Sequence, residues 1–69
     1  MPMVIEIKVV DEKLQRTYIL MNEQKKELCC FDHLSDASLV FRFLNGLAMT
    51  ETMEMMAYSL LVDSEKKYL

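Results

Sequence analysis

Both cysteines of the chain and its only histidine fall within five residues, Cys29–His33. Thiolates, imidazoles and carboxylates are the ligands that zinc and iron take from proteins, so Cys29, Cys30 and His33 are the cluster best suited to a metal. Structural zinc needs four ligands, however, and alternate residues of an extended segment point to opposite sides. We therefore expect no metal or other cofactor in one chain. The alternative is a metal- or redox-responsive regulator in which the clusters of two subunits meet.

Catalytic chemistry finds little support elsewhere in the sequence. A cysteine close to a histidine in sequence is not a catalytic pair unless the fold aligns the two, and no known signature surrounds them. The carboxylate pairs Asp32/Asp36 and Glu51/Glu54 are explained by the preference of acidic residues for helix N-termini. Phosphate-binding loops need several glycines, and the chain has one. We expect no enzymatic activity.

Three segments have the patterns of β-strands, separated by short polar breaks. The first alternates apolar and polar residues, and the others are rich in apolar, aromatic or β-branched residues. Because the breaks have hairpin length, we expect a three-stranded antiparallel meander. The predicted strands cover residues 3–10, 14–21 and 27–31. The inner face of the first should carry Met3, Ile5, Ile7 and Val9.

Two helices should follow the strands. Ser35 or Asp36 can cap the first, and the apolar positions after them recur at helical spacing. Gly46 suits the end of that helix, and Thr50 can cap the next. We predict helices at residues 36–45 and 51–67, forming an antiparallel hairpin on one sheet face. The fold class is then α+β (β-β-β-α-α), with a single domain over residues 1–69. The core-facing arc of the first helix should hold Ala37, Val40, Phe41 and Leu44.

The second helix has apolar residues on two opposite sides. One arc should face the core, and it holds Met53, Met56, Ala57, Leu60 and Leu61. The opposite side carries another apolar group, and the first helix adds two residues outside its own core-facing arc. Large apolar patches that a domain cannot cover usually mark interaction sites. The predicted protein interface consists of Leu39, Phe43, Met55, Tyr58 and Val62.

A second copy of the chain is the simplest partner for such a face. Two-fold homodimers are the commonest assemblies, and a chain of 69 residues has a thin core that a dimer would extend. Two alternatives remain: the sheet could wrap so that the second face packs internally, or a different protein could cover it. Flexible methionines, of which the chain has seven, suit either an adaptable binding surface or an irregular core.

The charge and hydropathy of the chain argue against nucleic acid and membranes as partners. The net charge is −3 and the basic residues are scattered, so we expect no binding to nucleic acid. The longest stretches without charge have eight residues, far short of a membrane span, and charges near the N-terminus argue against a signal peptide. We expect a cytoplasmic protein.

The chain resembles small accessory proteins of bacteriophages and mobile elements in general character, since it is short, acidic and without a catalytic signature. No motif points to a particular family. We predict a non-enzymatic interaction module, a homodimer that acts as an inhibitor or adaptor of another protein.

Overall fold

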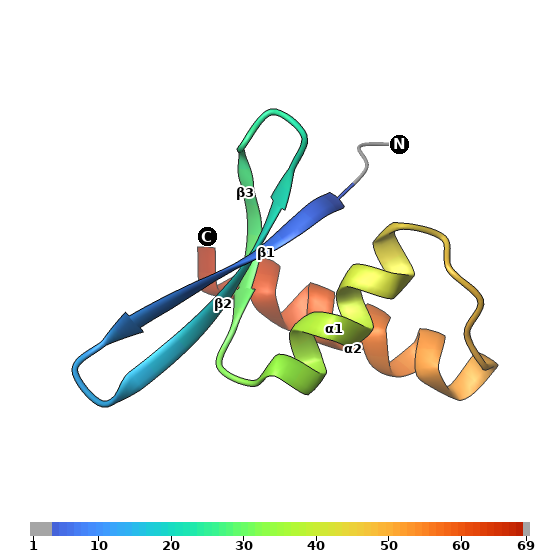
Figure 1. Ribbon diagram of the computed structural model, residues 1–69. Coiled ribbons are helices and arrows are strands. Elements are labelled where there is room, and N and C mark those ends of the chain that lie inside the picture. Colours follow the sequence, from blue (N-terminus) through green and yellow to red (C-terminus); the bar gives the residue numbers. More distant parts are fainter. Residues whose placement is uncertain (1–3, 69) are drawn as a thin grey trace.

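The computed structural model, which describes residues 4–68, has the element order β-β-β-α-α (Figure 1). One antiparallel sheet contains three strands in sequence order, β1 (Val4–Glu12), β2 (Gln15–Asn22) and β3 (Glu27–Phe31). Two helices follow, α1 (Leu34–Leu44) and α2 (Glu51–Tyr68). The predicted α+β fold is confirmed. Met3, predicted in the first strand, lies outside the described residues.

The β1–β2 hairpin turns more tightly than predicted. Its loop has two residues, Lys13 and Leu14, and Lys13 has a φ of 57°, the left-handed region that two-residue hairpin turns require. Leu14 is therefore the exposed tip of the hairpin and not the first residue of β2. At the base of the turn, Arg16 Nε donates a hydrogen bond to Asp11 Oδ1 at 2.6 Å, which raises the pKa of Arg16 above its usual range.

Asn22 organises the β2–β3 turn from a buried position. Its side-chain Oδ1 accepts hydrogen bonds from the backbone N–H groups of Gln24 (2.9 Å) and Lys26 (3.0 Å). Lys25, between them, has a φ of 64°, and its Nζ forms an ion pair with Glu6 of β1 at 2.7 Å. The polar segment predicted as a turn is thus held by the Asn22 amide together with two backbone hydrogen bonds, from the Asn22 N–H to the Lys26 carbonyl and from the Lys25 N–H to the Asn22 carbonyl.

One face of the sheet forms half of the core. The register places Ile7, Leu20 and Cys29 across from one another, and side chains directly opposite on neighbouring strands share a face. The helices supply the other half of the buried cluster, which consists of Leu20, Cys29, Phe31, Ala37, Val40 and Ala57. Val9, predicted to be buried, is exposed, because this end of the β1–β2 hairpin extends beyond the helices (Figure 1).

The ends of the two helices follow local sequence signals, with one exception. α1 begins at Leu34, so Ser35 and Asp36 lie in its first turn, and the predicted N-cap was wrong. The N-cap is His33. Its backbone carbonyl accepts a hydrogen bond from the Ala37 N–H at 3.1 Å, and its side chain makes no capping hydrogen bond. His33 has an extended backbone, with φ −123° and ψ 134°, and the helical conformation begins at Leu34, ahead of Ser35 and Asp36.

The other two predicted signals are confirmed. Gly46 has a φ of 68°, and its N–H donates to the Phe43 carbonyl while the Leu47 N–H donates to the Arg42 carbonyl. These two bonds form a Schellman motif, which satisfies carbonyls at the end of α1. Thr50 Oγ1 accepts a hydrogen bond from the Met53 N–H at 3.2 Å, as expected of the residue before α2.

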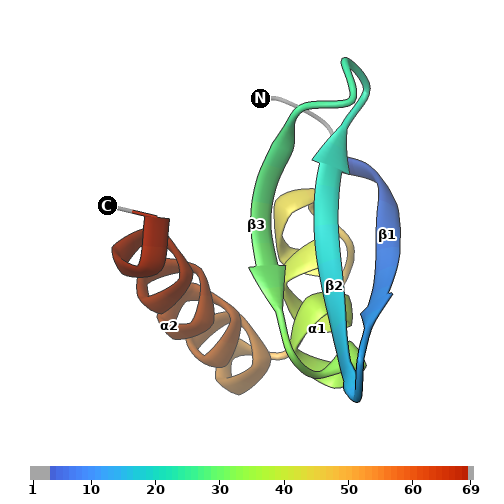
Figure 2. The ribbon, with the colours of Figure 1, turned by 90° about the vertical axis from the view of Figure 1, so that its left-hand side faces the viewer.

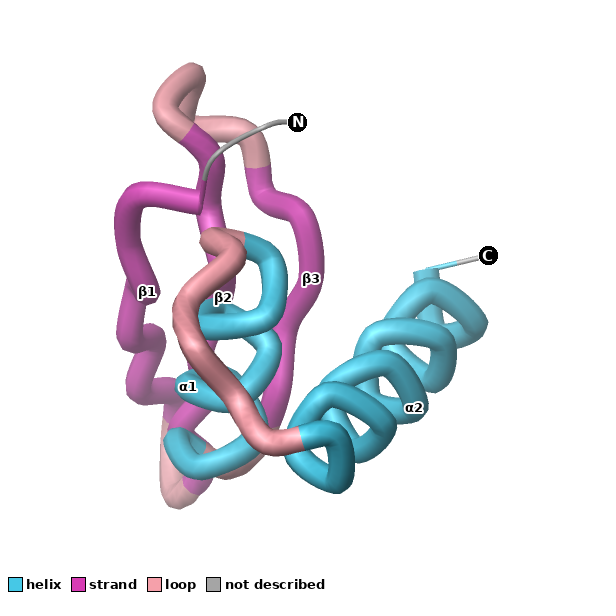
Figure 3. The backbone as a smooth tube through the Cα atoms, turned by 90° about the vertical axis from the view of Figure 1, so that its right-hand side faces the viewer, coloured by secondary structure: helices cyan, strands magenta, loops and turns pink. Residues whose placement is uncertain are grey.

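The two helices occupy different places relative to the sheet. α1 lies over one face and contacts all three strands, whereas α2 lies alongside β3 and, within residues 4–68, contacts only β3 and α1. Figure 2 shows α1 behind the sheet and α2 out to the side of β3. In Figure 3 the loop that joins the helices crosses from one position to the other. Much of the circumference of α2 is therefore left uncovered.

Candidate protein-binding surface

The structure divides the five predicted interface residues into two groups. Leu39 and Phe43 of α1 are half-buried and pack against the buried cluster. They are covered because α1 lies between the sheet on one side and α2 on another. Within a single chain these two side chains therefore contribute to the core.

The other three residues belong to α2. Met55 is 67% exposed and Tyr58 is 60% exposed, while Val62 is half-buried. Their spacings of three and four residues place them in one row along the helix. We call Met55, Tyr58 and Val62 the outer stripe.

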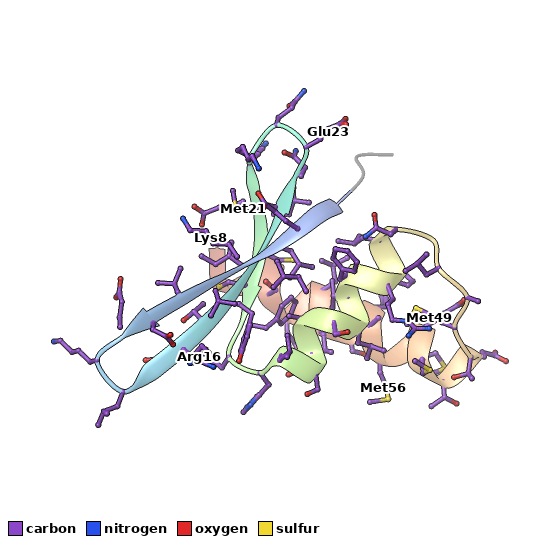
Figure 4. All side chains as sticks on the ribbon, in the orientation of Figure 1. Lys8, Arg16, Met21, Glu23, Met49 and Met56 are labelled. Atoms are coloured by element: carbon purple, nitrogen blue, oxygen red, sulfur yellow. The ribbon has the colours of Figure 1, made fainter. Side chains whose placement is uncertain are left out.

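Met56 joins the exposed apolar surface, although its position on the helix wheel predicted a core residue. Its side chain is 55% exposed, and it projects from α2 away from the sheet (Figure 4). Ala57 and Ser64, both buried, mark the centre of the packed side of α2. This side is narrow because α2 has only α1 and β3 to pack on, and Met56 falls outside it.

A groove runs along α2 on the side that faces the start of α1. Its apolar part is lined by Thr52, Met55, Met56, Ser59, Leu60 and Asp36. Its acidic part is a hollow of about 370 Å³ lined by Cys30, Phe31, Asp32, His33, Asp36, Leu60, Asp63 and Ser64. The two parts share Asp36 and Leu60 in their linings, so they lie next to each other, and we call them together the α2 groove.

Sequence patterns did not reveal this groove. Asp36 is explained in the sequence by its place near a helix N-terminus, and no sequence pattern relates it to Asp63 of α2. The two carboxylates come together only because α2 packs beside β3, next to the first turn of α1. A local sequence signal for this contact does not exist, since the residues belong to different elements.

The two cysteines lie in different surroundings. Cys29 is buried in the core, whereas Cys30 is half-buried and lines the acidic part of the α2 groove together with His33. They form no disulfide. Among residues 4–68, no group of three or more His, Cys, Asp or Glu side chains has an arrangement suited to a metal ion. One chain thus does not bring Cys29, Cys30 and His33 together.

Comparison with known proteins adds no functional assignment. No family model, curated protein or solved structure matches the chain. Neither described helix has both the length and the apolar character that crossing a bilayer requires. The surfaces of the chain itself are therefore the basis on which we infer its function.

Proposed function

We propose that the protein is a non-enzymatic interaction module that forms a homodimer and acts as an inhibitor or adaptor of another protein. The observation that carries this proposal is the outer stripe, where Met55 and Tyr58 are exposed on a helix whose inner side is already packed. Exposing such side chains to water is unfavourable by about 25 cal/mol per Å² of apolar surface. Contiguous apolar surface on a helix therefore favours association with another protein.

A second copy of the chain suits the outer stripe for two reasons. The buried cluster has six residues, two of them alanines, and small domains with thin cores are often stabilised by association. An antiparallel pairing of two α2 helices about a two-fold axis would also be self-complementary. It would place Met55 opposite Val62 of the partner subunit, with Tyr58 next to the axis.

The variant Met55→Asp with Tyr58→Asp tests the dimer. Both side chains are exposed in a single chain, so the fold should survive while the charges prevent the stripe from being buried. Light scattering should give twice the chain mass of 8.1 kDa for the wild type and 8.1 kDa for the variant. Circular dichroism should show the same secondary structure in both.

A matched control introduces two aspartates at exposed leucines outside the outer stripe, as Leu14→Asp with Leu34→Asp. This control should remain dimeric. A wild type that is monomeric at about 100 μM, a concentration at which a specific dimer is well populated, would contradict the proposal. So would a double variant of the outer stripe that stays dimeric.

A further inference from the structure

We infer that the α2 groove binds a segment of a partner protein in which apolar side chains lie next to a lysine or arginine. The inference rests on the proposed function, because it names the chemistry that the interaction module would recognise. It uses a surface next to the outer stripe, and the two share only Met55.

The apolar part of the groove is suited to aliphatic or aromatic side chains. Met55 and Met56 are both exposed there, and Leu60 forms the wall nearer the core. Thr52 and Ser59 have small side chains, which leave room for a helix or an extended segment to lie against Met56 and Leu60. Methionine side chains adapt to irregular partners, so this part provides contact area with little demand on exact shape.

The acidic part of the groove defines the charge of the partner. The carboxylates of Asp32, Asp36 and Asp63 line it, and none of the described residues that line it is a lysine or arginine. Asp36 is half-buried, and charge-assisted hydrogen bonds at partly desolvated sites are stronger than those in open water. An ammonium or guanidinium group complements this lining, whereas a carboxylate or phosphate would be repelled.

Ser64 provides an independent indication of a hydrogen-bonding ligand. It lines the acidic part, is only 2% exposed, and its Oγ is buried without a hydrogen-bond partner among the described residues. A buried hydroxyl without a partner costs about 1–3 kcal/mol. A cation N–H that reaches this position would give Ser64 Oγ the hydrogen-bond partner that it lacks.

The residues shared by the two linings show how close the apolar and charged groups of the partner must be. Asp36 and Leu60 belong to both parts, so a bound segment that leaves the apolar part passes directly into the acidic part. Its cation must therefore lie close to its apolar residues in the sequence, without a long spacer. A homodimer through the outer stripe would cover Met55 and leave Met56, Leu60 and the acidic part to contact this segment.

The test uses a fluorescein-labelled peptide of about 14 leucine and lysine residues in a helical pattern, and the same peptide with glutamate in place of lysine. Fluorescence anisotropy should detect binding of the lysine peptide alone. In the variant Asp36→Asn with Asp63→Asn, the Kd for this peptide should rise about tenfold or more, because two carboxylates that face the cation are neutralised.

The matched control is Glu12→Gln with Glu23→Gln, which removes the same charge at two exposed positions outside the groove. Its Kd should change by less than about twofold. Amide NMR signals of Asp36, Leu60 and Ser64 should shift on titration, and those of β1 should not.

Three results would overturn the inference: no binding of the lysine peptide at about 100 μM, equal binding of the glutamate peptide, or equal losses in the groove variant and its control. Light scattering of the groove variant distinguishes a failure of peptide binding from a failure of the proposed dimerisation. Asp36→Asn with Asp63→Asn leaves the outer stripe intact and should remain dimeric, whatever the peptide does.

Discussion

At the scale of single residues, Asn22 has the clearest structural role. Its buried Oδ1 accepts two backbone hydrogen bonds that close the β2–β3 turn. In Asn22→Ala both N–H groups lose their acceptor in a partly buried place, and each such loss costs about 1–3 kcal/mol before relaxation and hydration by water. We expect the free energy of unfolding to fall by about 1–3 kcal/mol, measured by urea denaturation.

Gln24→Ala, in the same turn, is the control. The Gln24 side chain is exposed, while its backbone N–H, which donates to Asn22, is retained in the variant. Its unfolding free energy should stay within about 0.5 kcal/mol of the wild type. Equal effects of the two substitutions would mean that the Asn22 amide does not organise the turn.

At the scale of elements, the end of α1 depends on the backbone conformation of Gly46. Its φ is 68°, and nothing lies within 4 Å of the place where a Cβ would be, so a side chain would meet conformational strain but no clash. Gly46→Ala should therefore destabilise the protein by about 1–2 kcal/mol, since L-residues resist the left-handed region. Thermal denaturation monitored at 222 nm, the α-helical band, would measure this loss.

Gly46→Asn distinguishes strain from the positive φ and lack of space for a side chain as causes of such a loss. Asparagine tolerates a positive φ better than alanine does, although its side chain is larger. If the backbone conformation decides the outcome, Gly46→Asn should be milder than Gly46→Ala. The reverse order would indicate that space, and not φ, limits this position.

At the scale of the whole molecule, a homodimer makes stability depend on concentration. Because association through the outer stripe would stabilise only the folded state, the melting temperature of the wild type should rise with protein concentration. The variant Met55→Asp with Tyr58→Asp should melt at one temperature throughout. A hundredfold change in protein concentration changes the stabilisation of the folded state by association by roughly 2.7 kcal/mol. Differential scanning calorimetry over this range would detect the resulting shift in melting temperature. A wild type without this dependence would argue against dimerisation.

Local patterns in the sequence were sufficient to predict the type and order of the elements. Alternating residues in β1, helical spacing in α1, and local signals at Gly46 and Thr50 act within a few positions of one another, so they can be read without the fold. The boundary errors arose where backbone conformation overrode residue preference. Lys13 tightened the first turn by taking a positive φ, and His33 served as N-cap in place of Ser35 or Asp36.

Which sides of the helices are covered depends on tertiary packing, which the sequence patterns do not show. The wheel of α2 shows two apolar sides, but it does not say that α2 lies beside β3. That position leaves Met56 exposed, and it brings Asp36 and Asp63 into one groove. Helix placement depends on contacts between residues distant in the chain, and these contacts leave no periodic signal within any one segment.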